Sequence, residues 1–207
     1  VVYKSSTVVG VKLSGLEDYF LIFATDMGDY LDIQKGLRAK VTSWRHVSDN
    51  SIPMRCKVNG AYANAALIKT EALDDGYDEA IVLTDDGHVS EGSAENIFLL
   101  RDGKLVTPPE TDDILPGITR DTVITLAKEE LGIPVEIRRI DRTELYIAEE
   151  AFFCGTGAQI APIAEVDHRP LGDGSVGPVT KSLQELYFKI VRGQVEKYMD
   201  WCTPVFI

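Results

Sequence analysis

Apolar and polar positions alternate with a period of two over several short segments, which predicts β-strands. Residues 37–44 (LRAKVTSW) alternate in this way, whereas residues 18–27 (DYFLIFATDM) form a mostly apolar run that indicates a buried strand. Residues 79–92 and 96–109 each contain two strand-like runs joined by Asp-Gly, the pair that favours a tight hairpin turn. Residues 135–141 predict one further strand.

Apolar residues recur with helical spacing in three longer segments. Residues 61–76 predict a helix that ends at a glycine, residues 117–132 give the clearest helix, and residues 177–198 predict a long amphipathic helix. Residues 150–163 predict a strand, a glycine-rich turn and a returning strand. Hairpins mixed with separate helices are typical of an α+β fold with a largely antiparallel sheet. No linker or repeat divides the chain, which favours a single domain.

The charge and cysteine content narrow the functional classes. The chain of 207 residues has 33 acidic and 21 basic residues, a formal charge of −12 that disfavours nucleic acid as a partner. No segment predicts a membrane span or a signal peptide. Cys56, Cys154 and Cys202 are far apart in the sequence, which is typical of reduced thiols in a cytoplasmic protein and not of a disulfide framework or a metal site.

Two glutamates, Glu91 and Glu95, stand among small residues directly before the apolar run of residues 97–100. A buried carboxylate is costly unless a donor or a cation pairs with it. This segment is therefore either a solvated turn or the holder of a charged partner that another part of the chain supplies.

Two loops offer backbone N–H groups to an anion. Residues 115–121 (LPGITRD) place Gly117 and Thr119 at the start of the clearest helix, where the N–H groups and the helix dipole attract negative charge. The local sequence alone favours a simpler interpretation, in which Thr119 caps the helix. The turn around Thr156 (CGTGAQ) could bind a phosphate or a carboxylate, although an ordinary tight turn is again the simpler interpretation.

Lys57 lies between Cys56 and Val58 and shortly before Tyr62. Most lysines are solvated, but a lysine whose amine sits in a closed pocket can form a Schiff base with an aldehyde. Pyridoxal phosphate is such an aldehyde, and it also needs an anion site for its phosphate and a carboxylate facing its pyridine nitrogen. The chain offers a candidate for each part, and local chemistry permits this combination without selecting it.

The motifs resemble those of the branched-chain amino acid aminotransferases, which belong to fold type IV of the pyridoxal-phosphate enzymes. The matching segments, in the family's order, are residues 55–65, 76–98, 105–123 and 151–163. The similarity runs roughly from residue 18 to residue 201 and is weakest over the first fifteen or so residues. It implies that residues 18–207 form the large cofactor-binding domain, and that residues 1–17 are the remnant of a junction to a small N-terminal domain.

The resemblance assigns roles to the residues around the lysine and the glutamates. Lys57 matches the catalytic lysine that binds pyridoxal 5′-phosphate and shuttles the substrate proton. Tyr62 matches the tyrosine on the phenolic oxygen of the cofactor, and Glu91 matches the carboxylate on its pyridine nitrogen. Glu95 and Asn96 match residues that shape the wall of the cofactor pocket.

The resemblance also assigns the phosphate and substrate contacts. Leu115 would lie against the cofactor ring, and the phosphate cup would be formed by Gly117, Ile118 and Thr119. Thr156 and Gly157 match a turn that contacts the phosphate or the substrate carboxylate, and Tyr30 matches a residue lining the substrate pocket. Gly157 and Ala94 depart from the alanine and glycine, respectively, of many relatives. The remaining polar residues of note are predicted as surface or turn residues: His46, His88, His168, Arg45, Lys69 and Arg120.

The implied activity is transamination between a branched-chain or similar hydrophobic L-amino acid and 2-oxoglutarate, without a metal, in a cytoplasmic homodimer or larger assembly. The family's small domain supplies an arginine to the cofactor phosphate that this chain does not match, so we expect the 207 residues alone to bind the cofactor weakly. D-amino acid aminotransferases, R-selective amine transaminases and aminodeoxychorismate lyases share the same motif residues and stay open. A regulatory module without catalysis and a purely structural protein remain further alternatives.

Overall fold

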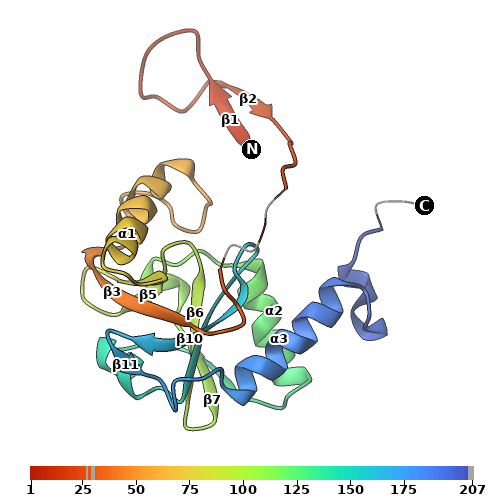
Figure 1. The fold of residues 1–207 in the computed structure, drawn as a ribbon. Helices are drawn as coiled ribbons and strands as arrows, with labels where there is room; N and C mark the ends of the chain where they lie inside the picture. Colours follow the sequence, from red (N-terminus) through yellow and green to blue (C-terminus); the bar gives the residue numbers. More distant parts are fainter. Residues whose placement is uncertain (27, 29–30, 205–207) are drawn as a thin grey trace.

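The body of the protein is built on one nine-stranded, mixed sheet, seen in Figure 1 in a computed structural model that describes residues 1–26, 28 and 31–204. Its strands are β3 (Leu37–Arg45), β4 (Glu79–Leu83), β5 (Val89–Gly92), β6 (Asn96–Arg101), β7 (Lys104–Thr107), β8 (Val135–Ile137), β9 (Glu150–Gly155), β10 (Gln159–Val166) and β11 (Arg169–Pro170). The spatial order is β5-β4-β3-β10-β9-β6-β7-β8, with β11 on β10. Only β3 with β4, β3 with β10, and β7 with β8 pair in parallel among the described strands. The expected α+β fold with a largely antiparallel sheet is confirmed.

Both predicted Asp-Gly hairpins form. The turn between β6 and β7 places Asp102 at φ 50° and Gly103 at φ 71°, and two successive positive φ angles match the twist of the strands on either side. Gly87 has φ 90° in the turn between β4 and β5. Residues 150–163 form the third expected hairpin, because β9 pairs antiparallel with β10.

The three α-helices are α1 (Tyr62–Asp74), α2 (Ile118–Glu129) and α3 (Pro178–Val191). Figure 1 shows α2 and α3 together on one side of the sheet and α1 on another, over β3 and β4. Because side chains alternate along each strand, the apolar core is divided into two clusters, one on each face of the sheet. In the cluster that α2 and α3 cover, Phe98 stacks on Phe152 with 5.2 Å between ring centroids, whereas Ile97 and Leu99 belong to the other cluster.

Helices α1 and α2 agree with their predicted ranges, whereas α3 is shorter than residues 177–198 suggested. The chain leaves the helix at Val191 because Gly193 takes φ 66°, a left-handed conformation that ends helices. The short 3-10 helices are η1 (Asn59–Ala61), η2 (Glu110–Asp112), η3 (Arg142–Ile147) and η4 (Glu196–Trp201).

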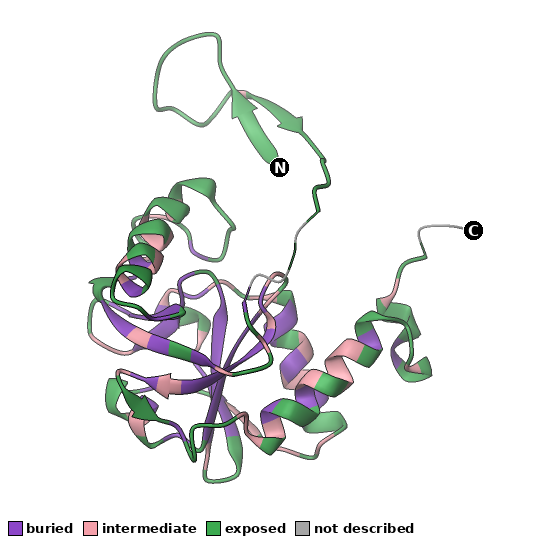
Figure 2. Cartoon of the chain, in the orientation of Figure 1, coloured by how far each residue is buried: buried purple, intermediate pink, exposed green. Residues whose placement is uncertain are grey.

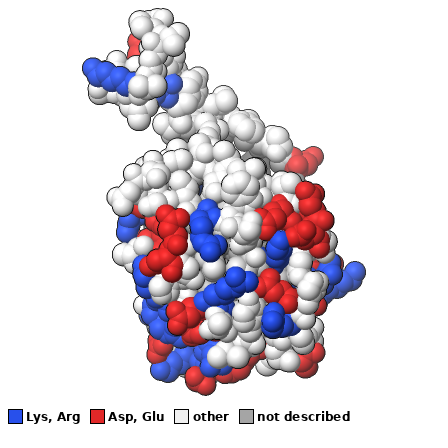
Figure 3. All heavy atoms as spheres, turned by 90° about the vertical axis from the view of Figure 1, so that its left-hand side faces the viewer, with Lys and Arg blue, Asp and Glu red and all other residues white. Residues whose placement is uncertain are grey.

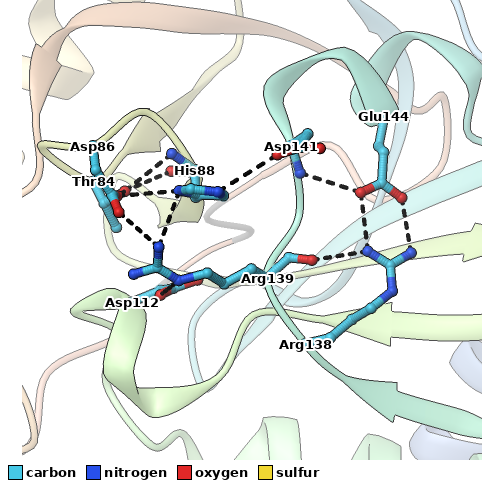
Figure 4. Close-up of polar contacts among 8 residues, drawn as sticks. All are labelled: Thr84, Asp86, His88, Asp112, Arg138, Arg139, Asp141 and Glu144. Carbon is cyan, nitrogen blue, oxygen red and sulfur yellow. Dashed lines mark hydrogen bonds and ion pairs between the residues drawn. The ribbon is translucent and has the colours of Figure 1, made fainter.

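The strand expected over residues 135–141 is split between two partners. Its first part, β8, pairs with β7, and the residues after it cross to the edge of β5, where Val89 N–H donates to Ile140 C=O at 2.9 Å. Figure 4 shows the ionic cluster around this junction, in which the Arg139 guanidinium contacts Asp86 at 2.6 Å and Asp112 at 3.0 Å. This junction, the β5 seam, curls the sheet so that its two ends meet.

Residues 18–26, the described part of the segment 18–27, do not form the predicted buried strand. Among the described strands, β2 (Glu17–Phe20) pairs only with β1 (Val2–Ser5), and Figures 1 and 2 show this exposed hairpin apart from the body. Phe20 is 69% exposed because no described segment packs on the hairpin. Few charges lie on it in Figure 3, while acidic and basic side chains intermingle on the body. The predicted domain boundary at residue 18 stays a prediction.

The N-terminus of α3 depends on one carboxylate from the sheet. Glu150, at the start of β9, accepts hydrogen bonds from the backbone N–H groups of Val179 (3.0 Å) and Thr180 (2.7 Å) and from the Thr180 hydroxyl (2.7 Å). Gly177 leaves room for this contact, since a Cβ there would lie 2.0 Å from the Glu150 carboxyl carbon. A residue remote in sequence thus replaces the usual N-cap side chain.

We expect Glu150→Ala to lower the free energy of unfolding by about 2 kcal/mol, because the first-turn N–H groups of α3 lose their acceptor. Urea unfolding followed by circular dichroism measures the change. Glu185→Ala, at an exposed position of the same helix, is the control and should change the free energy by less than about 0.5 kcal/mol. Equal effects in the two variants would contradict this account of the cap.

Candidate active site

One cavity of about 620 Å³ gathers the predicted site residues from five parts of the chain. It lies among the loop before α1, the strands β5 and β6, the start of α2 and the β9–β10 turn. The predicted site residues on its wall are Lys57, Tyr62, Glu91, Glu95, Asn96, Leu115, Gly117, Ile118, Thr119, Thr156 and Gly157. Tyr30, predicted in the substrate pocket, lies outside the described residues.

Glu91 is the carboxylate with the most complete set of donors in this cavity. Its Oε2 accepts hydrogen bonds from Asn96 Nδ2 at 2.9 Å and from the Leu115 N–H at 3.3 Å, and its Oε1 lies 3.3 Å from His46 Nε2. The side chain is buried. The segment before the apolar run is therefore not a solvated turn, and the partner of Glu91 comes from elsewhere in the chain.

His46 was predicted as a surface or turn residue, and that prediction is wrong. Its side chain is 6% exposed because the alternation along β3 shifts: Val41 and Thr42 are both buried, and the pairing with β4 is irregular between Val41 and Arg45. The His46 N–H then bonds to Leu83 C=O at 2.9 Å, so its side chain turns inward while Arg45 stays exposed. Strand alternation alone does not reveal such a shift.

Glu95 is buried with far fewer partners than Glu91. Its Oε2 accepts the Ala94 N–H at 3.0 Å, while its Oε1 has no hydrogen-bond partner among the described residues. Burial and the nearby Glu79 carboxylate raise the pKa of Glu95 from 4.5 to about 8. Two glutamates four residues apart thus meet opposite environments in one cavity.

Asn96 joins Glu91 to the loop before α2. Its Nδ2 also donates to Leu115 C=O at 2.8 Å, and a Cβ at Gly117 would lie 2.1 Å from its Oδ1. A glycine at position 117 is therefore required for Asn96 to approach the start of α2. The same loop carries Ile118, which is 87% exposed.

The start of α2 suits an anion. Gly117 is the N-cap residue and no side chain caps this end within the described residues, so the expectation that Thr119 caps the helix is wrong. Thr119 lies in the first turn instead, and its hydroxyl bonds with Tyr187. The first N–H groups of α2 keep their capacity for an external acceptor on the cavity wall.

Lys57 is exposed at the mouth of the cavity and does not lie in a closed pocket as its neighbours in sequence suggested. Its ammonium lies 5.6 Å from the centroid of the Tyr62 ring, at the start of α1. Helix α1 is held on β3 by Glu71, whose Oε1 accepts from Lys40 Nζ (2.8 Å) and the Ser43 N–H (3.0 Å). Thr156 is likewise exposed, in the β9–β10 turn across the same cavity.

Two residues predicted as surface charges are structural. Arg120 is buried and donates to the Thr107 hydroxyl at 3.3 Å and to Pro108 C=O at 3.0 Å, which fixes the first turn of α2 against β7. Burial lowers the pKa of the Arg120 guanidinium. Lys69 Nζ lies 2.5 Å from the fully buried carboxylate of Glu79. Both contacts arise from tertiary packing, which single-residue statistics do not show.

Comparison with known proteins gives consistent results. The sequence model of the amino-transferase class IV family matches residues 10–166. A probable branched-chain-amino-acid aminotransferase of Aquifex aeolicus is 54% identical over 195 residues, and the enzyme of Pseudomonas aeruginosa is 44% identical over 207 residues. The matches cover 94% and 99% of this chain but 63% and 67% of those relatives, so the chain spans about two thirds of their length.

Solved structures show the same similarity. A branched-chain aminotransferase from Thermoproteus uzoniensis, crystallised with norvaline, superposes with a TM-score of 0.94 at 47% identity and covers 99% of this chain and 67% of its own. The pyridoxal-phosphate form of the Thermobaculum terrenum enzyme gives 0.81 at 45% identity, over 83% and 56%. The resemblance to this family and the expected fold are confirmed. Within the described ranges, no helix is long and apolar enough to cross a membrane.

The raised pKa of Glu95 predicts how stability depends on pH. The folded state holds this proton more tightly than the unfolded state, so its stabilising contribution is complete below about 4.5 and is lost as the pH rises through about 8. We expect Glu95→Gln to flatten this decline and to be the more stable protein above pH 8, by on the order of a few kcal/mol. Thermal unfolding between pH 5 and 9 without cofactor measures it.

The matched control is Glu185→Gln on the exposed face of α3, which should follow the unmodified protein at every pH. A decline of the same slope in Glu95→Gln would show that another group carries the pH dependence.

Proposed function

The chain belongs to the class IV aminotransferases, and we propose that the whole protein transfers an amino group between a branched-chain or similar hydrophobic L-amino acid and 2-oxoglutarate, with pyridoxal 5′-phosphate as cofactor. The observation that carries the proposal is the convergence of Lys57, Glu91 and the N-terminus of α2 on one cavity. We further propose a cytoplasmic homodimer or larger homo-oligomer, on the resemblance to the family.

The residues present fit this cofactor. A cavity of about 620 Å³ lies in the usual range for small-molecule sites. Its wall offers a primary amine at Lys57, a firmly held carboxylate at Glu91 and uncapped helix N–H groups at the start of α2. These are the groups that an aldehyde, a pyridine nitrogen and a phosphate need, respectively.

The cofactor, when bound, supplies an aldehyde that condenses with amines and a ring that accepts the electrons left by a departing α-proton. Lys57 Nζ is the amine that would hold the cofactor, and as a free amine it would act as the base that takes the substrate α-proton and as the acid that gives a proton back. A single amine acting as both base and acid suits a position at the mouth of the cavity, open to incoming substrate. Glu91 would present its negative charge to the ring nitrogen of the cofactor, which favours a protonated nitrogen.

The remaining wall residues bind and orient. The Tyr62 hydroxyl would hydrogen-bond to the phenolic oxygen of the cofactor, and Leu115 would lie against the ring. The N–H groups at the start of α2 would receive the phosphate, helped by the helix dipole, and the Thr119 hydroxyl would join them by turning from Tyr187 to the phosphate. Thr156 and Gly157 contact the phosphate or the substrate carboxylate from the β9–β10 turn. Glu95 and Asn96 shape the wall beside Glu91, Asn96 by fixing the carboxylate and the loop at once.

The proposed substrate class rests on the relatives, which are branched-chain aminotransferases and match most of this chain. Assays of the whole protein with leucine, D-alanine or a chiral amine, each with 2-oxoglutarate, separate this proposal from the other transaminases of the same fold. Turnover with leucine supports the branched-chain assignment. Turnover with D-alanine or the R-amine alone would overturn it while leaving the cofactor chemistry intact.

Lys57→Ala should abolish the visible absorption band of pyridoxal 5′-phosphate bound to the whole protein and lower transaminase activity by at least about 100-fold, because no other amine takes its place at the cofactor. Absorption spectra and mass spectrometry after borohydride reduction measure the covalent link. Lys181→Ala, at an exposed position of α3, is the control and should keep both the band and the activity. A labelled lysine other than Lys57 would disprove the assignment.

A further inference from the structure

We infer that His46 is a positioning residue for the proposed cofactor site, a doubly protonated imidazolium that fixes the orientation of the Glu91 carboxylate. The inference rests on the proposed function only for its consequence, namely that the charge on His46 controls how firmly the cavity holds a ring with a protonated nitrogen. The pairing of His46 with Glu91 itself is a property of the ligand-free protein.

With Glu91 as a carboxylate, the geometry calls for protons on both nitrogens of His46. Nε2 lies 3.3 Å from Glu91 Oε1, and Nδ1 lies 3.2 Å from the backbone oxygen of Val47. Both partners are acceptors, and a neutral imidazole has only one N–H to donate. A neutral His46 would therefore leave one buried acceptor facing a lone pair, whereas the imidazolium satisfies both.

The surroundings of His46 also favour the cation. Burial by itself lowers the pKa of His46, but the hydrogen bond and charge of Glu91 on β5, the Val47 carbonyl and the Asp113 carboxylate after η2 outweigh it, and the pKa is raised. Helix α1 contributes a neutral neighbour, since Asn64 Oδ1 accepts the Val47 N–H at 3.1 Å. The charged groups that act on His46 from β5 and from the loop after η2 are thus both anions.

The charges alternate toward the cavity, because the positive His46 imidazolium is followed by the negative Glu91 carboxylate. The imidazolium places a positive charge against the Glu91 carboxylate, and the carboxylate presents its negative charge to the cavity, where it favours the protonated form of a ligand ring nitrogen. The Oε2 atom is held by Asn96 and Leu115, and His46 fixes the rotation of the carboxyl plane through Oε1. Loss of the proton from His46 removes both the orientation and the compensating charge.

The first experiment reads the protonation of His46 directly in the protein without cofactor. Long-range ¹H–¹⁵N spectra at neutral pH should show both His46 nitrogens protonated, and the pKa of His46 should lie above the ordinary value of a histidine. Glu91→Gln should move the His46 midpoint down by at least one pH unit. One unprotonated His46 nitrogen at pH 7, or an unchanged midpoint in Glu91→Gln, would overturn the inference.

The second experiment separates charge from hydrogen bonding. His46→Gln keeps a donor near the Nε2 position without the charge, and His46→Arg keeps a cation. We expect the glutamine variant of the whole protein to bind pyridoxal 5′-phosphate at least 10-fold more weakly than the unmodified protein, a loss of about 1.4 kcal/mol or more in binding free energy. The arginine variant should bind it within about threefold of the unmodified affinity. His168→Gln is the matched control, and thermal unfolding checks that each variant folds.

The pH profile completes the test. The unmodified protein should lose affinity for the cofactor as the pH rises through the His46 midpoint, and His46→Arg should not, because its charge does not titrate in this range. Equal affinities of unmodified and glutamine proteins would overturn the positioning role. If the spectra show the imidazolium but no variant and no unmodified protein binds the cofactor, the proposed function fails while the pairing stands.

Discussion

A carboxylate buried beside a cavity must be paired from several directions, and Glu91 shows how much of the fold serves that requirement. An isolated buried carboxylate costs many kcal/mol, and hydrogen bonds with an adjacent cation offset that cost only if their geometry is well defined. The donors to Glu91 come from the residue after β3, from β6 and from the loop before α2. The sheet order places β5 one strand away from β3, across β4, which brings these segments together.

The loop between β7 and α2 is the least regular of these contributors and is fixed at several points. Arg120 anchors the first turn of α2 to the end of β7, and Asn96 binds the Leu115 carbonyl from β6. Asp112, in η2 in the middle of the loop, is fully buried and ion-paired with Arg139 across the β5 seam. A loop fixed at these points keeps the N-terminus of α2 at a constant distance and orientation relative to the Glu91 carboxylate, as preorganised binding requires.

Local signals in the sequence predicted most of the secondary structure. The Asp-Gly pairs and the helix-ending glycines act within a few residues, so their effects could be inferred without knowledge of the fold. The errors share a different origin. His46 turns inward because of a register shift in β3, Arg120 is buried by packing of α2 on β7, and Phe20 is exposed because β2 has only β1 for a neighbour. Each depends on contacts between segments distant in the sequence.

The same division holds for the site. The cofactor residues predicted from the family motifs line one cavity, because each motif occupies a turn or a strand end that opens onto it. Tyr30 lies outside the described residues. His46 belongs to none of those motifs. Its only local signal is a histidine at the end of an alternating strand, which is compatible with either face of the sheet.

The β5 seam bears on self-association as well as on the position of Glu91. A strand at the end of an open sheet offers unpaired N–H and C=O groups to any second chain, and burying that edge removes the template for aggregation. At β5 the Val89 N–H is already taken by Ile140, so the strand that carries Glu91 does not present this atom to a foreign strand. The β1–β2 hairpin lacks that protection, because it is exposed and its two strands pair with no other strand in the described part of the chain. Unwanted strand exchange between molecules should therefore begin at the hairpin and leave the curled sheet intact.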